Sequence, residues 1–347
     1  MTLLSLYLYQ LVIIVSYNFR VNNKILGGLF CISWVALFAF RGKEYGLDIE
    51  TYYNIFLDPD YYRLDEPLLV LINSLLSIAS NDLFWFNLTY ALLINVTLYY
   101  FFYKTSENFV ICFILFSTSF LFYQFNLNIF RQGLANTLSV LFMVMFYRNK
   151  IYCSLLLLLP VFLHKSSVIF FLYFILSHFR INKNLVIFIL ISSLTPLIAI
   201  LPKLLIEIAS SIFPFLSNAL TEYQRVSSNG EIGASSFNHR NIPVICSIFI
   251  VYLRWDSLDT KRGERILASM LVFSFLFATV FTGNVLLYDR LIIPAQLISV
   301  IFIVDYLKQK IRVYFPVVIM LLVIFSSLFT VLFWGPRNFL PEYEFLF

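Results

Sequence analysis

Arginine and glutamine stand together at the start of a predicted helix, in the otherwise apolar stretch NLNIFRQGLANTL. The planar guanidinium of Arg131 matches phosphate oxygens through two parallel hydrogen bonds, and the amide of Gln132 can add another, so the pair could bind a phosphate group. A charge within a membrane helix costs free energy unless a partner or a ligand meets it. The alternative is a structural pair between Arg131 and a carboxylate.

A second polar stretch, FRGKEYGLDIETYYNIF over residues 40–56, follows directly on an apolar run. Arg41 could bind an anion there, and Tyr52 could contact a sugar. Asp48 could accept a proton from a sugar hydroxyl, as a general base does. The competing interpretation of Arg41 is an arginine that reaches from the end of a membrane helix toward lipid headgroups.

Two further stretches place polar residues at helix ends. VFLHKSSVIF holds His164 and Lys165 between two apolar runs, and YDRLIIPAQL holds Tyr288 and Arg290 at the start of another. His164 is a candidate base, Lys165 and Arg290 are candidate anion ligands, and Tyr288 is a candidate sugar contact. The alternatives are simple packing for His164 and an internal ion pair between Asp289 and Arg290.

Composition shows which elements must position these residues. Of the 347 residues, 61% are hydrophobic and 12% are charged, whereas soluble domains have roughly 45–50% apolar and 25% charged residues. Apolar runs close to the roughly 20 residues that a helix needs to cross a bilayer recur along the chain. The predicted fold class is therefore all-α, a polytopic integral membrane protein of about 12 transmembrane helices in a single domain over residues 1–347.

The spans and loops follow from the alternation of apolar runs with polar connectors. We place the spans near residues 2–17, 24–40, 83–103, 109–127, 129–147, 151–163, 166–179, 184–201, 243–254, 265–282, 288–306 and 313–334. Two longer loops, 41–66 and 202–242, and a short re-entrant or interfacial helix at 67–80 lie outside them. The connectors rich in Lys and Arg fall on one side, which the positive-inside rule assigns to the cytoplasm. The candidate residues, with Arg240 of the second loop as a further anion ligand, then face the other side together.

Several kinds of chemistry lack their usual sequence signals. The four cysteines show no CxxC spacing, so we expect neither a zinc site nor a disulfide framework. The sequence contains no P-loop, no G-x-G-x-x-G fingerprint, no HExxH motif and no G-x-S-x-G elbow. We therefore expect no metal, no cofactor and no nucleic-acid partner.

Five motifs occur in the order that is typical of one family of membrane enzymes: FRGKEYGLDIETY, DEPLLVLIN, NIFRQGLANTL, FLHKSSVIFF and YDRLIIPAQL. Through them the chain resembles the EpsG-like, Wzy-type polysaccharide polymerases over about residues 30–300. Leu47 departs from the family pattern, which often has threonine before the aspartate.

The resemblance implies an O-antigen or exopolysaccharide polymerase, a metal-independent glycosyltransferase of the bacterial inner membrane. Such an enzyme joins undecaprenyl-diphosphate-linked oligosaccharides at the periplasmic face and releases undecaprenyl diphosphate. Arginines could stabilise the charge that develops on the leaving pyrophosphate, and the candidates for this role are Arg41, Arg131 and Arg290. The choice of the base stays open among Asp48, Glu66 and His164.

Three other classes stay open. A lipid-linked oligosaccharide flippase would also bind pyrophosphate, although alternating access usually spreads polar sites through helices at the middle of the membrane. An O-antigen ligase would use the same donor with a different acceptor. A structural membrane protein would use its arginines to bind headgroups. The expected partners are lipid-linked oligosaccharides and membrane lipids, and the sequence leaves open the glycan, the oligomeric state and any chain-length regulator.

Overall fold

The structure is a computed structural model, and it describes residues 12, 22–42, 48–58, 66–147, 156–177, 182–187, 241–258, 262–281 and 285–338. Within these ranges the regular structure is entirely helical, which confirms the all-α fold class. The chain forms two compact units, the first of residues 1–170 and 304–347 and the second of residues 171–303. The expected single transmembrane domain stays a prediction.

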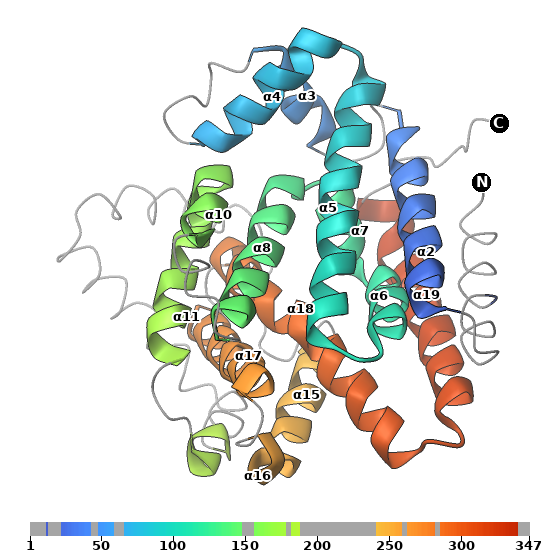
Figure 1. Cartoon of the computed structure of the whole chain (residues 1–347), viewed down its shortest axis with the longest axis vertical. Coiled ribbons are helices and arrows are strands. Elements are labelled where there is room, and N and C mark those ends of the chain that lie inside the picture. The colour runs from blue at the N-terminus through green and yellow to red at the C-terminus, as the bar shows by residue number, and fades with distance from the viewer. Residues whose placement is uncertain are drawn as a thin grey trace. The chain divides into compact units, whose positions relative to one another are not determined.

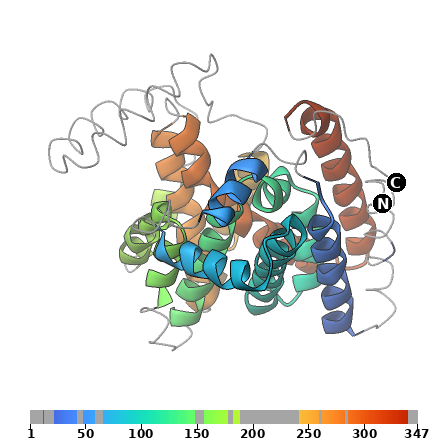
Figure 2. The same cartoon turned by 90° about the horizontal axis from the view of Figure 1, so that it is seen from above.

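The first unit contains most of the described helices (Figure 1). They are α2 (Asn23–Ala39), α3 (Ile49–Leu57), α4 (Pro67–Ala79), α5 (Leu83–Thr105), α6 (Phe109–Ser117), α7 (Phe120–Leu127), α8 (Phe130–Tyr147), α10 (Leu158–Leu163), the 3-10 helix η2 (Lys165–Val168) and α19 (Phe315–Asn338). Within this unit α2 packs along α5, as both views show (Figures 1 and 2). The largest fully buried side chains of this unit are aromatic, among them Trp34, Tyr90 and Phe122.

The second unit contains α15 (Ile242–Leu253), α16 (Trp255–Leu258) and α17 (Arg262–Val280). Helices α11 (Ile169–Ser177) and α18 (Val285–Lys310) contain residues of both units. In the second unit the hydroxyl of Ser247 donates to the carbonyl of Ser299 over 2.9 Å, which ties α15 to α18.

Local sequence signals start several of these helices. The side chain of Asn22 accepts a hydrogen bond from the backbone N–H of Lys24, and Ser119 caps α7 in the same way through the N–H of Phe122. Short polar side chains at this position satisfy backbone donors that have no partner inside the helix. Pro67 occupies the first turn of α4, where its missing N–H costs nothing.

Three helical segments among the described residues are long and apolar enough to cross a membrane: Leu83–Thr105, Gly263–Val280 and Tyr288–Lys310. Helices α6 and α7 raise the number to four if they form one span that bends by 77°. Shorter apolar segments of 10–17 residues, among them Asn23–Ala39 and Pro67–Ala79, are also present in this part of the chain. These helices indicate a membrane-embedded protein, but twelve spans are not confirmed, and most of the predicted spans 2–17 and 184–201 lies outside the described ranges.

The bend between α6 and α7 is stabilised by hydroxyl groups of α19. The carbonyl of Thr118 at the break accepts hydrogen bonds from Thr330 over 2.7 Å and from Ser326 over 3.3 Å. The hydroxyl of Thr118 in turn donates to Ser326 over 2.9 Å. Backbone groups that leave the helical pattern in an apolar surrounding need such partners. The residues of the predicted span at 109–127 form two helices that meet at this bend.

Helix α8 begins close against α7. A Cβ atom added to Gly133 would lie 2.5 Å from the ring of Phe125, much closer than side chains tolerate. Glycine is therefore what allows the first turns of α8 to approach α7. This contact positions the N-terminal end of α8, which carries Arg131.

Candidate functional site

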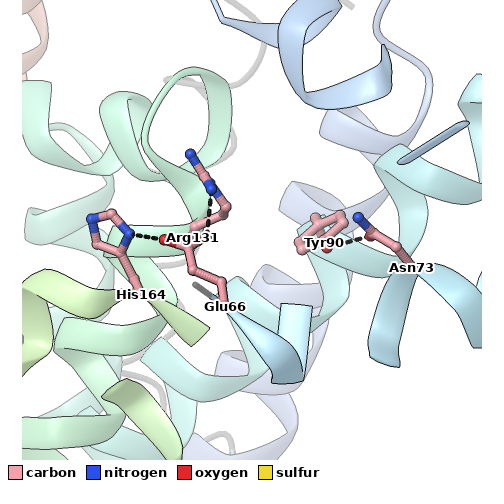
Figure 3. A network of polar contacts seen from close by, with 5 residues as sticks. All are labelled: Glu66, Asn73, Tyr90, Arg131 and His164. Carbon is pink, nitrogen blue, oxygen red and sulfur yellow. Dashed lines mark hydrogen bonds and ion pairs between the residues drawn. The ribbon is translucent and has the colours of Figure 1, made fainter. Parts of the chain in front are cut away.

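Glu66 joins two of the other candidate residues in one buried cluster. One oxygen of its carboxylate forms an ion pair with the guanidinium of Arg131, and the other lies 2.7 Å from Nδ1 of His164. Figure 3 shows Glu66 between these two side chains. Glu66 is only 2% exposed. A carboxylate buried to this degree requires charged or hydrogen-bonding partners, and here it has both.

The three side chains come from three separate elements of the first unit. Glu66 immediately precedes α4, and its carboxylate makes no capping hydrogen bond to that helix. Arg131 lies in the first turn of α8. His164 separates α10 from η2 and has an extended backbone, with φ −158° and ψ 117°. Because α10 contacts both α4 and α8, the break at His164 directs the imidazole to where the other two side chains meet.

The partners of Glu66 determine its charge. Burial alone would raise the pKa of this carboxyl, but the hydrogen bond from His164 and the positive charge of Arg131 outweigh burial and lower the pKa below its ordinary value. A carboxylate only accepts hydrogen bonds, so the hydrogen between the two groups resides on Nδ1 of His164. In the neutral imidazole, the lone pair is then on Nε2, which can accept a proton.

Helix α3 brings two more candidates toward Arg131. The guanidinium carbon of Arg131 lies 4.6 Å from the ring centroid of Tyr52, a distance typical of a cation–π contact. Burial raises the pKa of Tyr52 and also that of Asp48, and in both cases the nearby charge of Arg131 opposes the shift. A carboxyl with a raised pKa exchanges a proton more readily near neutral pH, so Asp48 stays a candidate base.

Aromatic rings support the start of α8. The ring of Phe130 lies 4.2 Å from that of Tyr52 and 4.4 Å from that of Tyr90, centroid to centroid. The hydroxyl of Tyr90 donates to the side chain of Asn73 over 2.7 Å, so α4 and α5 are tied together beside the cluster (Figure 3). These contacts restrict the position of the residue that follows Phe130, which is Arg131.

Arg41 belongs to a different network. Its guanidinium donates to the side chain of Asn87 over 3.1 Å and to the backbone carbonyl of Asn126, while the amide of Asn87 donates to the carbonyl of Arg41 over 3.0 Å. Asn95 extends this network by donating to Asn126 over 2.8 Å. Arg41 thus ties the end of α2 to α5 and α7, and its binding of pyrophosphate stays a prediction.

The other candidates are placed as follows. Gln132 is buried beside Arg131, and Lys165 is exposed at the start of η2. Tyr288 and Arg290 belong to the second unit, where the hydroxyl of Tyr288 accepts a hydrogen bond from Asn241. Arg240 lies outside the described residues. Within the first unit the structure therefore brings Asp48, Tyr52, Glu66 and His164 into one group with Arg131.

Arg131 does pair with a carboxylate, that of Glu66, which was the structural alternative to phosphate binding. The same carboxylate also contacts the imidazole of His164. Sequence reasoning missed the asparagines of the helices, among them Asn73, Asn87 and Asn126. Their signal is an amide inside an apolar helix, where an unsatisfied polar group is costly. Among the described residues, no three His, Cys, Asp or Glu side chains gather in a way that could hold a metal ion.

Comparison with known proteins gives one match. The model of a family described as the EpsG family matches residues 24–345. No curated protein and no solved structure matches the chain.

Proposed function

Because the chain belongs to the EpsG family, we propose that it is a polysaccharide polymerase of the bacterial inner membrane. It joins undecaprenyl-diphosphate-linked oligosaccharide repeat units at the periplasmic face, as Wzy-type O-antigen polymerases do, and releases undecaprenyl diphosphate. The reaction is a glycosyl transfer that uses side chains alone. The observation that supports this most strongly is the cluster of Glu66, Arg131 and His164.

The cluster contains the two functions that the reaction needs. His164 takes the proton of a hydroxyl on the acceptor sugar at Nε2, and that oxygen attacks the anomeric carbon of the donor. The bond between this carbon and the pyrophosphate oxygen breaks, and its electron pair leaves with undecaprenyl diphosphate. Arg131 stabilises the negative charge that develops on the pyrophosphate.

Glu66 connects the two functions through charge. With the imidazole neutral, Arg131 and Glu66 balance each other, so the resting cluster has no net charge. When His164 becomes protonated, Glu66 stabilises the imidazolium through the 2.7 Å contact to Nδ1. The cluster then carries one positive charge, at the same moment as the leaving pyrophosphate gains negative charge. Protonation of His164 and departure of the pyrophosphate therefore favour each other.

A reconstituted reaction tests this function. Lipid-linked repeat units are extracted from a strain of the native host that lacks the gene, and the purified protein is added in detergent micelles without other enzymes. We expect a ladder of lipid-linked products that differ by one repeat unit, together with released undecaprenyl diphosphate. Absence of any product longer than one unit would contradict the proposal, and it is the result that a flippase would give.

The polysaccharide profile of the same deletion strain separates polymerase from ligase. A polymerase deletion removes long chains but retains single repeat units on the lipid A core. A ligase deletion removes both, and that result would overturn the proposal in favour of the ligase.

A further inference from the structure

Two buried polar atoms, on the helices that carry or adjoin residues of the cluster, have no hydrogen-bond partner among the described residues. They are Nδ2 of Asn136, a side chain 2% exposed, and Oγ of Ser167, 1% exposed. Buried amide and hydroxyl groups in native proteins are nearly always hydrogen-bonded, because burial removes their contacts with water. Each such group requires an explanation, and a ligand that supplies the missing partner is one.

The positions of the two residues connect them to the candidate site. Asn136 follows Arg131 by five residues on α8, which is about 7.5 Å along the helix axis. Ser167 follows His164 by three residues in η2, and its backbone N–H donates to the carbonyl of His164 over 2.9 Å. Helices α8 and η2 contact each other within the first unit. Asn136 and Ser167 therefore lie on two helices that pack against each other. Arg131 lies at the N-terminal end of α8, and His164 directly precedes η2.

Polar side chains next to Asn136 on α8 do have hydrogen-bond partners. The hydroxyl of Thr137 donates to the carbonyl of Gly133, and that of Ser139 donates to the carbonyl of Ala135, each over 2.8 Å. Gln132 precedes Asn136 by four residues, so the two amides share one side of the helix. Gln132 is also buried.

We propose that Asn136 and Ser167, assisted by Gln132, form a subsite for the hydroxyl groups of the sugar that lies next to the reacting pyrophosphate. This inference rests on the proposed function and adds a binding role for neutral side chains. An amide N–H donates to a hydroxyl oxygen, and a serine hydroxyl can both donate and accept. These groups complement an uncharged carbohydrate, whereas a phosphate would call for cationic ligands.

Isosteric variants test the subsite. Asn136→Leu keeps the volume of the side chain and removes its amide, and Ser167→Ala removes one oxygen. Thr137→Val is the matched control, because it removes a hydroxyl of the same helix that already has an intrahelical partner. The measurements are the KM and kcat of polymerisation, the Kd of the oligosaccharide released from its lipid by mild acid, and the Tm of each purified protein.

We expect Asn136→Leu and Ser167→Ala each to raise KM and the oligosaccharide Kd about tenfold, the loss of one good hydrogen bond. Their Tm should equal or exceed that of the wild type, since neither Nδ2 of Asn136 nor Oγ of Ser167 has a hydrogen-bond partner in the part of the chain that the structure describes. Thr137→Val should leave KM unchanged. Ser167→Ala alone is sufficient for the test if Asn136→Leu does not fold, because it removes a single atom.

The outcomes separate this inference from the function on which it rests. A wild-type protein that forms no polymer refutes the proposed function. A wild-type protein that polymerises, with both variants retaining its KM and Kd, overturns only the subsite and assigns the two atoms to bound water. An increase in KM and Kd for either variant, without an increase for Thr137→Val, supports the subsite.

Discussion

Oε1 of Glu66 lies 2.7 Å from Nδ1 of His164, although 98 residues separate the two in the sequence. The same carboxylate pairs with Arg131 through its other oxygen. A histidine oriented by a carboxylate is a recurring arrangement for a general base, because the carboxylate fixes the tautomer and stabilises the protonated ring. The relationship makes Glu66 a positioning residue in the proposed reaction, with His164 as the base.

Glu66→Gln should lower kcat about 100-fold or more while changing KM little, because a carboxamide cannot stabilise the imidazolium. The measurement is the initial rate of polymerisation by purified protein, with chromatography and Tm to show that the variant is folded. Glu50→Gln is the control, since Glu50 is exposed on α3 and outside the cluster. Equal kcat values for Glu66→Gln and the wild type would rule out the positioning role.

Arg131→Lys should retain the ion pair with Glu66 but lower kcat about 100-fold, because an ammonium lacks the fork that fits a pyrophosphate. The lysine variant is preferred to Arg131→Ala, which would leave a buried carboxylate without its cation. The ladder of products should shorten in parallel. Arg312→Lys, at an exposed position, is the control, and an unshortened ladder for Arg131→Lys would count against phosphate binding.

Stability should fall on acidification because of Glu66. Its pKa in the folded protein is below the ordinary value of 4.5, so the unfolded chain binds a proton that the folded chain excludes. The contribution to stability is complete above the ordinary pKa and disappears as the pH falls through the lower folded value. Burial raises the pKa of Asp48, which therefore contributes in the opposite direction.

The measurement is the Tm of the purified protein at intervals between about pH 6 and pH 3.5. We expect the Tm of the wild type to fall more steeply than that of Glu66→Gln, and that of Asp48→Asn to fall more steeply than either. Parallel curves for the wild type and Glu66→Gln would show that Glu66 does not have the lowered pKa.

Local patterns in the sequence predict the individual helices well. The predicted segments 83–103, 243–254 and 67–80 correspond to α5, α15 and α4 with ends that differ by few residues. Each is an apolar run between polar residues, and such a pattern requires no knowledge of the rest of the fold. The position of Arg131 in the first turn of α8 was predicted for the same reason.

Partners distant in the sequence could not be predicted in this way. The cost of burying Arg131 indicates that it needs a partner, but it does not show that the partner is Glu66, 65 residues earlier. Likewise, the bend at Thr118 depends on hydroxyls of α19 that lie more than 200 residues later in the chain. In both cases the deciding contact is tertiary, and a single sequence records only that a polar group is present.

Gly133→Ala should disturb the site without touching a functional side chain. The added Cβ would lie 2.5 Å from the ring of Phe125, so α7 and α8 must separate and Arg131 must move with α8. Overpacking of this kind costs about 1–3 kcal/mol, and a displaced catalytic group can lower the rate about 100-fold.

Gly28→Ala is the matched control, because a Cβ at Gly28 meets nothing within 4 Å, and alanine favours a helix over glycine by about 0.5–1 kcal/mol. We expect its Tm to stay equal or rise, while Gly133→Ala lowers both Tm and kcat. Adding Phe125→Leu to Gly133→Ala should recover part of both losses, because a smaller side chain makes room for the methyl group. If Gly133→Ala retains the wild-type kcat, the close approach of α7 and α8 is not what positions Arg131.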